Sequence, residues 1–173
     1  MKVTEMISQE KLEQRIKELA DQINKDYGDT PLRLIGVLKG SVFFLCELSK
    51  YLTMPVTMDF MKVSSYGNGT ESSGKLTIDL DVSESLSGEH VLLVEDIVDT
   101  GRTLQELKAL FLQRGPKSFA ACTLLDKPSR RVCPIEAEYT GFVIEDKFVV
   151  GFGMDYAQQY RNLPYIGMII ETE

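Results

Sequence analysis

Three acidic residues and a turn rich in hydroxyl groups stand close together near the middle of the chain. In the run VLLVEDIVDTGRT, residues 91–103, Glu95 and Asp96 follow an apolar segment, and Asp99 comes shortly afterwards. The run ends with Thr100, Gly101, Arg102 and Thr103. Adjacent carboxylates are poor in a strand core, but they can accept hydrogen bonds from vicinal hydroxyl groups or face a hydrated divalent cation. Their spacing therefore indicates a site for a polar ligand.

The turn at residues 100–103 is suited to binding a phosphate group. A turn between a strand and a helix presents several backbone N–H groups, and Gly101 lets this turn close tightly. Thr100 and Thr103 add hydroxyl groups. Helix capping is an alternative, since Thr103 with Glu106 fits a capping box, but capping leaves the adjacent acids unexplained. A phosphate cradle, two acids for a diol and one further acid predict a site for a phosphorylated sugar.

Alternating strand and helix patterns must position these residues. Apolar residues recur at helical spacing over 12–23, with Gly28 placed to end that helix, and again over 104–111. We expect a further helix at 42–52, a polar, mobile loop at 67–75, and strands at 31–38, 55–67, 75–81, 90–94, 118–125, 139–144, 147–153 and 165–170. This order predicts βαβ units and a largely parallel sheet. Ligands bind at the carboxyl ends of such strands, where residues 95–103 would lie.

Composition limits the classes of protein to consider. The chain has 173 residues, of which 43% are hydrophobic and 26% charged, as in a soluble globular protein of one domain. Its net charge of -7 argues against a general nucleic-acid binder. No stretch approaches the roughly 18 apolar residues of a membrane helix, and the N-terminus has no signal-peptide pattern. Cys46, Cys122 and Cys133 form no metal pattern with His90, which favours reduced thiols in a cytoplasmic protein.

Residues 91–103 resemble the binding motif of the type I phosphoribosyltransferases. Other segments narrow the resemblance to the hypoxanthine-guanine phosphoribosyltransferases, in the same order along the chain: LKGS (38–41), SSYG (64–67), LLDK (124–127), DKFVVGFGMDY (146–156) and YRNLPYIG (160–167). The resemblance spans nearly the whole chain. It implies an α/β fold, with a parallel-rich twisted sheet flanked by helices. It also implies a single domain, residues 1–173, with a small hood formed by the N-terminal segment and roughly residues 128–173.

The resemblance assigns sugar and phosphate roles to residues of these motifs. Glu95 and Asp96 would bind the ribose hydroxyls, and Asp99 would be the general base for N7 of a purine. The 5′-phosphate would be held by Asp99, Thr100, Gly101, Arg102 and Thr103, where the backbone N–H of Arg102 matters more than its side chain. The pyrophosphate would be held by Lys39, Gly40, Ser65, Tyr66 and Arg161. The family has a cis peptide before the lysine. Taken alone, Asp99 could be a helix cap, Lys39 a surface lysine and Arg161 part of a surface ion pair.

The same resemblance assigns a purine site and a metal. The purine would be bound by Ile97, Lys127, Phe148, Val149 and Asp155. Lys127 only donates hydrogen bonds, so it would favour a 6-oxopurine over adenine. Phe148 and Ile97 would pack on opposite faces of the ring, although core packing would explain either residue alone. Mg²⁺ is the implied cofactor, with Glu95, Asp96 and Asp155 as its protein ligands.

We therefore expect a cytoplasmic purine-salvage enzyme, a homodimer or homotetramer, that uses phosphoribosyl pyrophosphate and a 6-oxopurine. It would bind neither nucleic acid nor a membrane. Gly153 and Met154, before Asp155, leave the preference among hypoxanthine, guanine and xanthine open. Two alternatives remain. Asp-Thr-Gly at residues 99–101 also occurs in aspartic proteases, which need two such aspartates. Some proteins of the phosphoribosyltransferase fold instead regulate transcription by binding nucleic acid.

Overall fold

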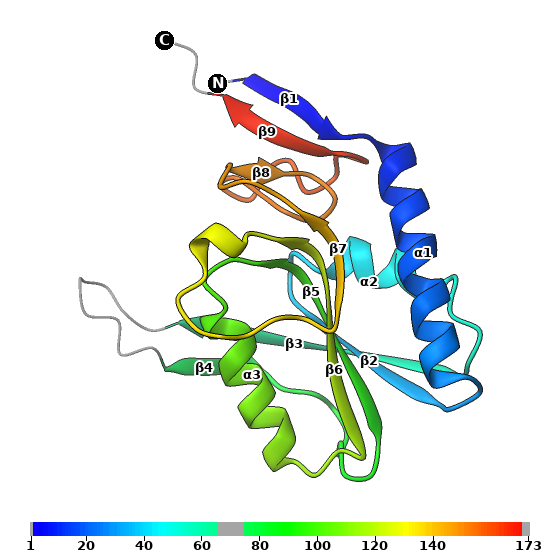
Figure 1. Ribbon diagram of the computed structural model, residues 1–173. Helices are drawn as coiled ribbons and strands as arrows, with labels where there is room; N and C mark the ends of the chain where they lie inside the picture. The colour runs from blue at the N-terminus through cyan, green and yellow to red at the C-terminus, as the bar shows by residue number, and fades with distance from the viewer. Residues whose placement is uncertain (1, 66–74, 171–173) are drawn as a thin grey trace.

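A mostly parallel central sheet organises the molecule (Figure 1). The computed structural model describes residues 2–65 and 75–170. Tyr66 and the predicted loop up to residue 74 lie outside this range. The strand order is β4-β3-β2-β5-β6-β7, and only the pairing of β4 with β3 is antiparallel. The strands are β2 (Leu32–Val37), β3 (Val56–Ser65), β4 (Leu76–Leu80), β5 (His90–Val98), β6 (Ser118–Asp126) and β7 (Tyr139–Val143). The predicted α/β class is confirmed.

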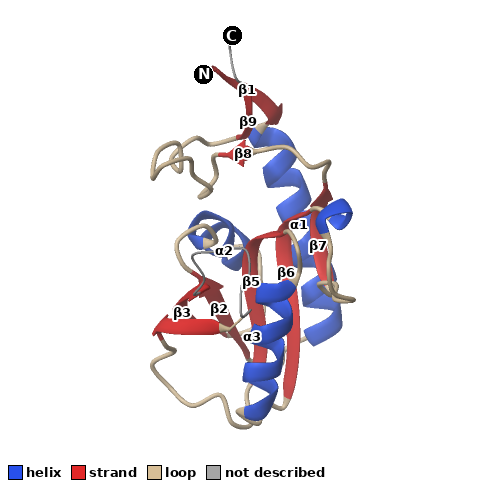
Figure 2. Ribbon diagram, turned by 90° about the vertical axis from the view of Figure 1, so that its left-hand side faces the viewer, coloured by secondary structure: helices blue, strands red, loops and turns tan. Residues whose placement is uncertain are grey.

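Helices cover both faces of this sheet (Figure 2). Helices α1 (Gln9–Tyr27) and α2 (Val42–Ser49) pack on one face, and α3 (Arg102–Gln113) packs on the other. Side chains alternate along a strand, so β5 sends Leu92 and Val94 to the first core and Val91 and Leu93 to the second. The two apolar cores pack on opposite faces of β5, which lies inside the sheet between β2 and β6.

The helix ends agree with the predictions to different degrees. Helix α1 begins after Ser8, whose hydroxyl accepts a hydrogen bond from the N–H of Lys11 at 3.3 Å. It ends at Gly28, which has φ = 56°, as the sequence predicted. Helix α2 ends at Ser49, short of the predicted residue 52. A short 3₁₀ turn, η1 (Pro128–Arg130), follows β6.

The prediction that the central strand ends at the acidic pair was wrong. Strand β5 continues through Glu95 to Val98 and pairs with β6 along that stretch. Its pairing with β2 stops earlier, at Val94 opposite Gly36. The last residues of β5 are therefore hydrogen-bonded on one side only. On this open side the turn after β2 approaches the strand, and Glu95 and Asp96 line a cavity there.

A second, smaller sheet lies at the end of the molecule that carries both termini (Figure 1). It has the order β1-β9-β8, with antiparallel pairs of β1 (Lys2–Ile7), β9 (Ile166–Ile170) and β8 (Val149–Val150). No pattern in the sequence had predicted β1 as a strand. Strand β7, although it follows residue 128, belongs to the central sheet. Within the described residues, no helix is both long and apolar enough to cross a membrane.

Candidate active site

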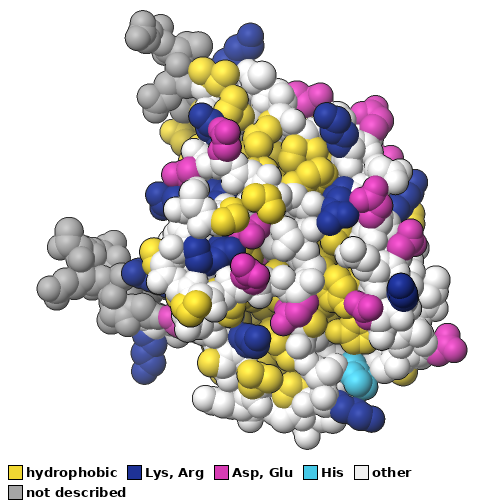
Figure 3. All heavy atoms as spheres, viewed as in Figure 1, with side chains coloured by type: hydrophobic (Ala, Val, Ile, Leu, Met, Phe, Trp, Pro, Cys, Tyr) yellow, Lys and Arg dark blue, Asp and Glu magenta, His cyan; other side chains and the backbone are white. Residues whose placement is uncertain are grey.

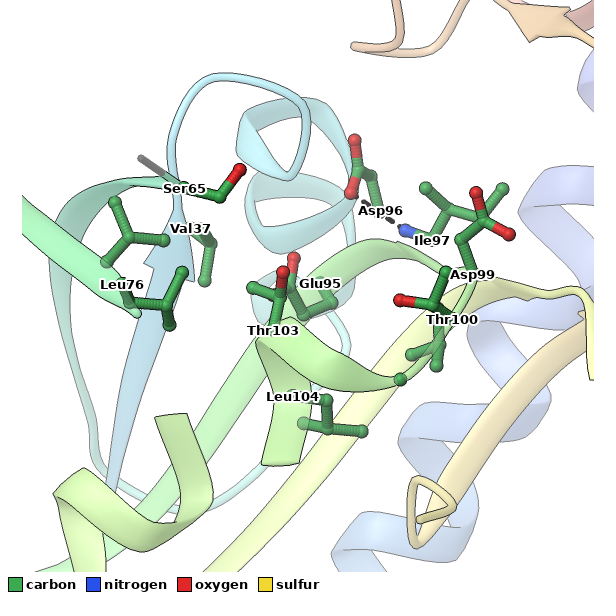
Figure 4. Close-up of a pocket in the computed structure, with 13 residues that line it drawn as sticks. Val37, Ser65, Leu76, Glu95, Asp96, Ile97, Asp99, Thr100, Thr103 and Leu104 are labelled. Carbon is green, nitrogen blue, oxygen red and sulfur yellow. Dashed lines mark hydrogen bonds between the residues drawn. The ribbon is translucent and has the colours of Figure 1, made fainter. Parts of the chain in front are cut away.

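A cavity of about 270 Å³ opens at the carboxyl end of β5 (Figure 4). The loop from Val98 to Gly101 and the first turn of α3 form one wall, and Ser65 of β3 lies on the other side. The cavity brings together these residues predicted for the sugar and phosphate groups: Ser65, Glu95, Asp96, Asp99, Thr100, Gly101 and Thr103. The described part of the chain thus gathers residues far apart in sequence around a polar, open hollow.

A second cavity, of about 220 Å³, adjoins the first. Both are lined by Asp96, Ile97 and Asp99. The rest of the second lining consists of Lys127, Phe148, Val149, Met154 and Asp155. All five residues predicted for the purine therefore line one hollow, and Met154, which the sequence had linked only to the choice among oxopurines, lines it as well.

The second cavity offers an aromatic surface and a buried cation. Phe148 is 55% exposed, which is unusual for a phenylalanine and leaves its ring accessible. The ring of Tyr156 packs edge-on against Phe148, with 5.6 Å between centroids. Lys127 is only 7% exposed, and its Nζ lies 3.6 Å from a carboxylate oxygen of Asp146. A flat, heteroaromatic ligand with a hydrogen-bond acceptor on its rim would suit this arrangement.

Burial shapes the charge of the acidic pair. Desolvation raises the pKa of Glu95 well above its ordinary value, and the neighbouring Asp96 raises it further. Desolvation also raises the pKa of Asp96 to about 6, although its carboxylate accepts a hydrogen bond from the N–H of Ile97 at 2.8 Å. Burial therefore disfavours the ionised form of both carboxylates when no ligand is bound. A ligand that brings donors or a cation would stabilise both ionised forms.

The first turn of α3 does not form the capping box that the sequence allowed. Gly101 is the N-cap, with φ = 84°, and no side chain caps the helix there. Glu106 instead accepts a hydrogen bond from the N–H of Leu76 at 2.8 Å. Thr103 consequently lines the cavity rather than serving as part of a cap. The N–H of Arg102 donates to the hydroxyl of Thr100 at 3.3 Å, and Arg102 itself lines neither cavity.

Two cationic side chains lie beside the cavities without lining them. Lys39 Nζ and Arg161 Nη2 each donate to the same atom, Gln158 Oε1, at 3.1 Å. Arg161 also pairs with Asp155 at 3.1 Å and donates to the carbonyl of Gly153 at 2.8 Å. The Leu38–Lys39 peptide is cis, as the resemblance implied. The turn after β2 and the segment before β9 are therefore tied together at the rim of the site.

Two arginines that were not predicted from the sequence, Arg130 and Arg131, hold Asp99 and the loop that it begins. Asp99 Oδ1 accepts from Arg130 Nε at 3.1 Å. Arg131 Nη1 donates to the backbone carbonyl of Asp99 at 2.8 Å, and its Nη2 pairs with Asp126. The consecutive arginines after LLDK were the available signal, but a charged pair in a loop is ordinarily solvated and gave no reason to select either one.

The carboxylates fit a magnesium ion that arrives with a ligand. Among residues 2–65 and 75–170, no three acidic, histidine or cysteine side chains are grouped as ligands of one ion, so Glu95, Asp96 and Asp155 do not form such a site alone. Asp96 and Asp155 do line the same cavity. Burial raises the pKa of Asp96, and a nearby cation would favour its ionised form. Mg²⁺ is usually bound by one or two carboxylates together with substrate phosphates.

The alternative functions find little support in this geometry. The single Asp-Thr-Gly lies between a parallel strand and a helix, in a mixed fold unlike the all-β retroviral-type proteases. On the face seen in Figure 3, basic and acidic side chains are interspersed, and no continuous basic stripe for a nucleic-acid backbone is visible there. The net charge of -7 points the same way.

Comparisons with known proteins identify close relatives. A family model described as "Phosphoribosyl transferase domain" matches residues 3–157. A hypoxanthine-guanine phosphoribosyltransferase of Streptococcus pneumoniae strain R6 is 50% identical, covering 96% of this chain and 92% of the relative. One from Bacillus subtilis strain 168 is 48% identical, over 95% and 91%. A crystal structure of such an enzyme from Bacillus anthracis, with HEPES in its active site, matches with a TM-score of 0.94 and 45% identity, covering 98% of this chain and 100% of that one.

Proposed function

This chain belongs to the phosphoribosyl transferase family, and we propose that it is a purine-salvage enzyme acting on 6-oxopurines. The reaction transfers the 5-phosphoribosyl group from phosphoribosyl pyrophosphate to N9 of hypoxanthine, and of guanine. The products are the nucleoside monophosphate, IMP or GMP, and pyrophosphate. The curated relatives carry the name of this activity at about half identity over nearly the whole chain.

One observation carries the proposal within the molecule: two adjoining cavities share Asp96, Ile97 and Asp99. The first has the backbone groups and hydroxyls that suit a sugar phosphate. The second has an accessible aromatic ring and a donor-only cation that suit an oxopurine. The bond between sugar and base would form where the two cavities meet, which is where Asp99 lies.

The residues around this junction have complementary tasks. Glu95 and Asp96 accept hydrogen bonds from the ribose hydroxyls, which fixes the sugar for attack at C1′. N9 of the purine supplies the electron pair of the new bond, and the bond from C1′ to the pyrophosphate oxygen breaks with its electrons leaving on pyrophosphate. Asp99 accepts the proton from N7, which keeps the ring nucleophilic. Such assistance is typically worth roughly 10²–10⁴-fold in rate.

Other residues are assigned to the leaving group and the metal. Lys39, Gly40 and Arg161 bind the pyrophosphate, with Ser65 at the end of β3 and the next residue of the chain, Tyr66, also contributing. Arg161 is suited to this task because its forked guanidinium matches two phosphate oxygens. Asp96 and Asp155, together with Glu95, would hold Mg²⁺ with the substrate. When bound, the ion neutralises the charge that develops on the pyrophosphate.

The base is selected by the second cavity. Lys127 donates to the 6-oxo group, which adenine replaces with a donor of its own. Phe148 and Ile97 sandwich the ring, and Val149 offers backbone groups to its edge. The backbone near Asp155 faces the 2-position, where hypoxanthine and guanine differ. We extend the proposal to a cytoplasmic homo-oligomer, a dimer or tetramer, in which residues 1–173 act as one domain with a hood over the base.

A substrate panel tests the proposal. The purified protein is given phosphoribosyl pyrophosphate and Mg²⁺ with hypoxanthine, guanine, xanthine or adenine, and nucleotide formation is followed by absorbance. We expect turnover of hypoxanthine and guanine but not of adenine, and no turnover after chelation of the metal. Turnover of adenine at a comparable rate would contradict the proposal that Lys127 selects 6-oxopurines. No turnover of any purine would overturn the proposed function.

A further inference from the structure

The segment 127–133 covers the outer side of the loop that forms the wall of the first cavity. The backbone N–H of Lys127 donates to the carbonyl of Val98 at 2.9 Å. Arg131 Nη1 donates to the carbonyl of Asp99 at 2.8 Å. The N–H of Val132 donates to the carbonyl of Thr100 at 3.0 Å. Three consecutive carbonyls of the loop therefore point toward this one segment, away from the first cavity.

The direction of these carbonyls fixes the direction of the loop's N–H groups. The only cis peptide among the described residues is Leu38–Lys39, so the peptides of the loop are trans. In a trans peptide, the carbonyl of one residue and the N–H of the next point in opposite directions. The N–H groups of Asp99, Thr100 and Gly101 consequently point away from the covering segment, into the cavity that the loop lines.

Arg131 is the one side chain in the covering segment that ties this loop to the central sheet. Its Nη2 pairs with Asp126, the last residue of β6, while its Nη1 holds the loop carbonyl of Asp99. Both charged side chains are largely buried, at 14% and 13% exposure. The stem of Arg131 also lies where a side chain on Gly101 would have to go. A planar fork can make both contacts at once, which a lysine cannot.

We propose that Arg131, anchored by Asp126, is a positioning residue for binding of the 5′-phosphate. It holds the carbonyl of Asp99 outward, so the N–H of Thr100 already faces the cavity before the substrate arrives. Preorganised donors bind an anion more tightly than donors that must first be ordered. The proposal rests on the proposed function, because it assigns the first cavity to the phosphate of that substrate.

The contribution of the 5′-phosphate can be measured separately from the rest of the ligand. Inosine and IMP differ only by this phosphate, so the ratio of their dissociation constants isolates it. We would measure both by calorimetry for the wild type and for Arg131→Met, which keeps the apolar stem, and Arg131→Lys, which keeps the charge. Arg114→Met is the matched control, since Arg114 pairs with Asp81 beyond the opposite end of α3.

We expect Arg131→Met to lower the inosine-to-IMP ratio about tenfold, equivalent to about 1.4 kcal/mol. Arg131→Lys should lower it by a smaller factor, because the charge remains and the fork is lost. The KM for phosphoribosyl pyrophosphate should rise in parallel, while the KM for hypoxanthine changes little. In Arg114→Met the ratio should stay at the wild-type value, although the protein melts at a lower temperature.

An unchanged ratio in Arg131→Met, with the wild type active, would overturn the inference and leave the proposed function standing. An inactive wild type would instead overturn the proposed function. If Arg131→Met does not fold, Asp126→Asn decides, since it retains Arg131 and removes only its anchor. We expect about a threefold lower ratio for Asp126→Asn, and a wild-type ratio in that variant would count against the proposal.

Discussion

The carboxylate of Asp96 occupies the space that a side chain on Gly40 would need. Gly40 lies in the turn after β2, and Asp96 lies in β5 beyond the point where β2 stops pairing with it. The missing side chain lets the turn approach the acid closely. A side chain on Gly153 would likewise collide with the carbonyl of Gly40, so the same turn also approaches the segment that carries Asp155 and Arg161.

Replacing Gly40 with alanine should therefore damage the site more than the fold. The added methyl group would displace Asp96, which we propose binds the ribose. We expect kcat/KM to fall about 100-fold and the free energy of unfolding to fall by about 1–3 kcal/mol, as in other overpacked sites. Steady-state kinetics and urea unfolding measure the two effects. Gly88→Ala is the control for activity, since a methyl group there meets nothing within 4 Å and Gly88 lines neither cavity, although its φ of 75° means that this variant also loses stability. An equal loss of activity in both variants would refute this account.

The sequence predicted the elements of this fold better than their limits. Periodicity located the helices and the parallel strands, because buried faces repeat every turn or every second residue. It did not show that β5 runs on through Glu95, since the pairing with β6 that extends it is a tertiary contact. Strand β1 was missed for the same reason: it exists through its pairing with β9, at the far end of the chain.

The residues of the candidate site were likewise predicted where a local motif marked them and missed where they depend on tertiary contacts. Residues within motifs, such as Asp99 and Lys127, were selected because their order matched a family pattern, and the fold brings them to adjoining cavities. Arg131 and Gln158 were not selected. Each acts through a contact with residues distant in sequence, Asp99 for Arg131 and Lys39 for Gln158, and no spacing rule encodes such a contact.

Asp96→Asn should make the protein more stable while removing its activity. Burial raises the pKa of Asp96 to about 6, so its contribution to stability is present below its unfolded pKa of about 4 and is lost as the pH rises through about 6. At pH 7.5 the neutral amide avoids this cost. We expect a gain of about 1–2 kcal/mol at pH 7.5, after allowing for partial exposure of the side chain, and only about 0.5 kcal/mol at pH 4.5, where the unfolded chain is already largely ionised at this position.

Urea unfolding at both pH values checks this prediction. Asp81→Asn is a control of opposite sign, because a hydrogen bond from Arg114 lowers the pKa of Asp81. That carboxylate stabilises the protein above its unfolded pKa, so its removal should cost stability at pH 7.5. If Asp96→Asn were destabilising at pH 7.5, the carboxylate would have to be stabilised by groups other than those seen around it.

Lys127→Met should weaken binding of the base without weakening binding of the sugar donor. The buried ammonium is the donor that we assign to the 6-oxo group, and a hydrogen bond from a charged group is worth about 1.5–3 kcal/mol. We expect the KM for hypoxanthine to rise roughly 10–100-fold, with the KM for phosphoribosyl pyrophosphate within about twofold. The exposed neighbour of Phe148 provides the control, Lys147→Met, which should behave as the wild type. A rise in both KM values would point to a collapsed cavity instead.

Asp99→Asn should slow the chemical step rather than substrate binding. Asp99 lies where the two cavities meet, and its carboxylate is held by Arg130 at 3.1 Å. The amide keeps the shape and can still face Arg130 with its oxygen, but it cannot take a proton from N7. We expect kcat at saturating substrates to fall roughly 10²–10⁴-fold. Both KM values, measured by varying each substrate in turn, should change little. Arg130→Gln leaves the carboxylate in place and should retain most of kcat. Full activity in Asp99→Asn would show that Asp99 only orders the loop, and the proton of N7 would then have to leave to solvent.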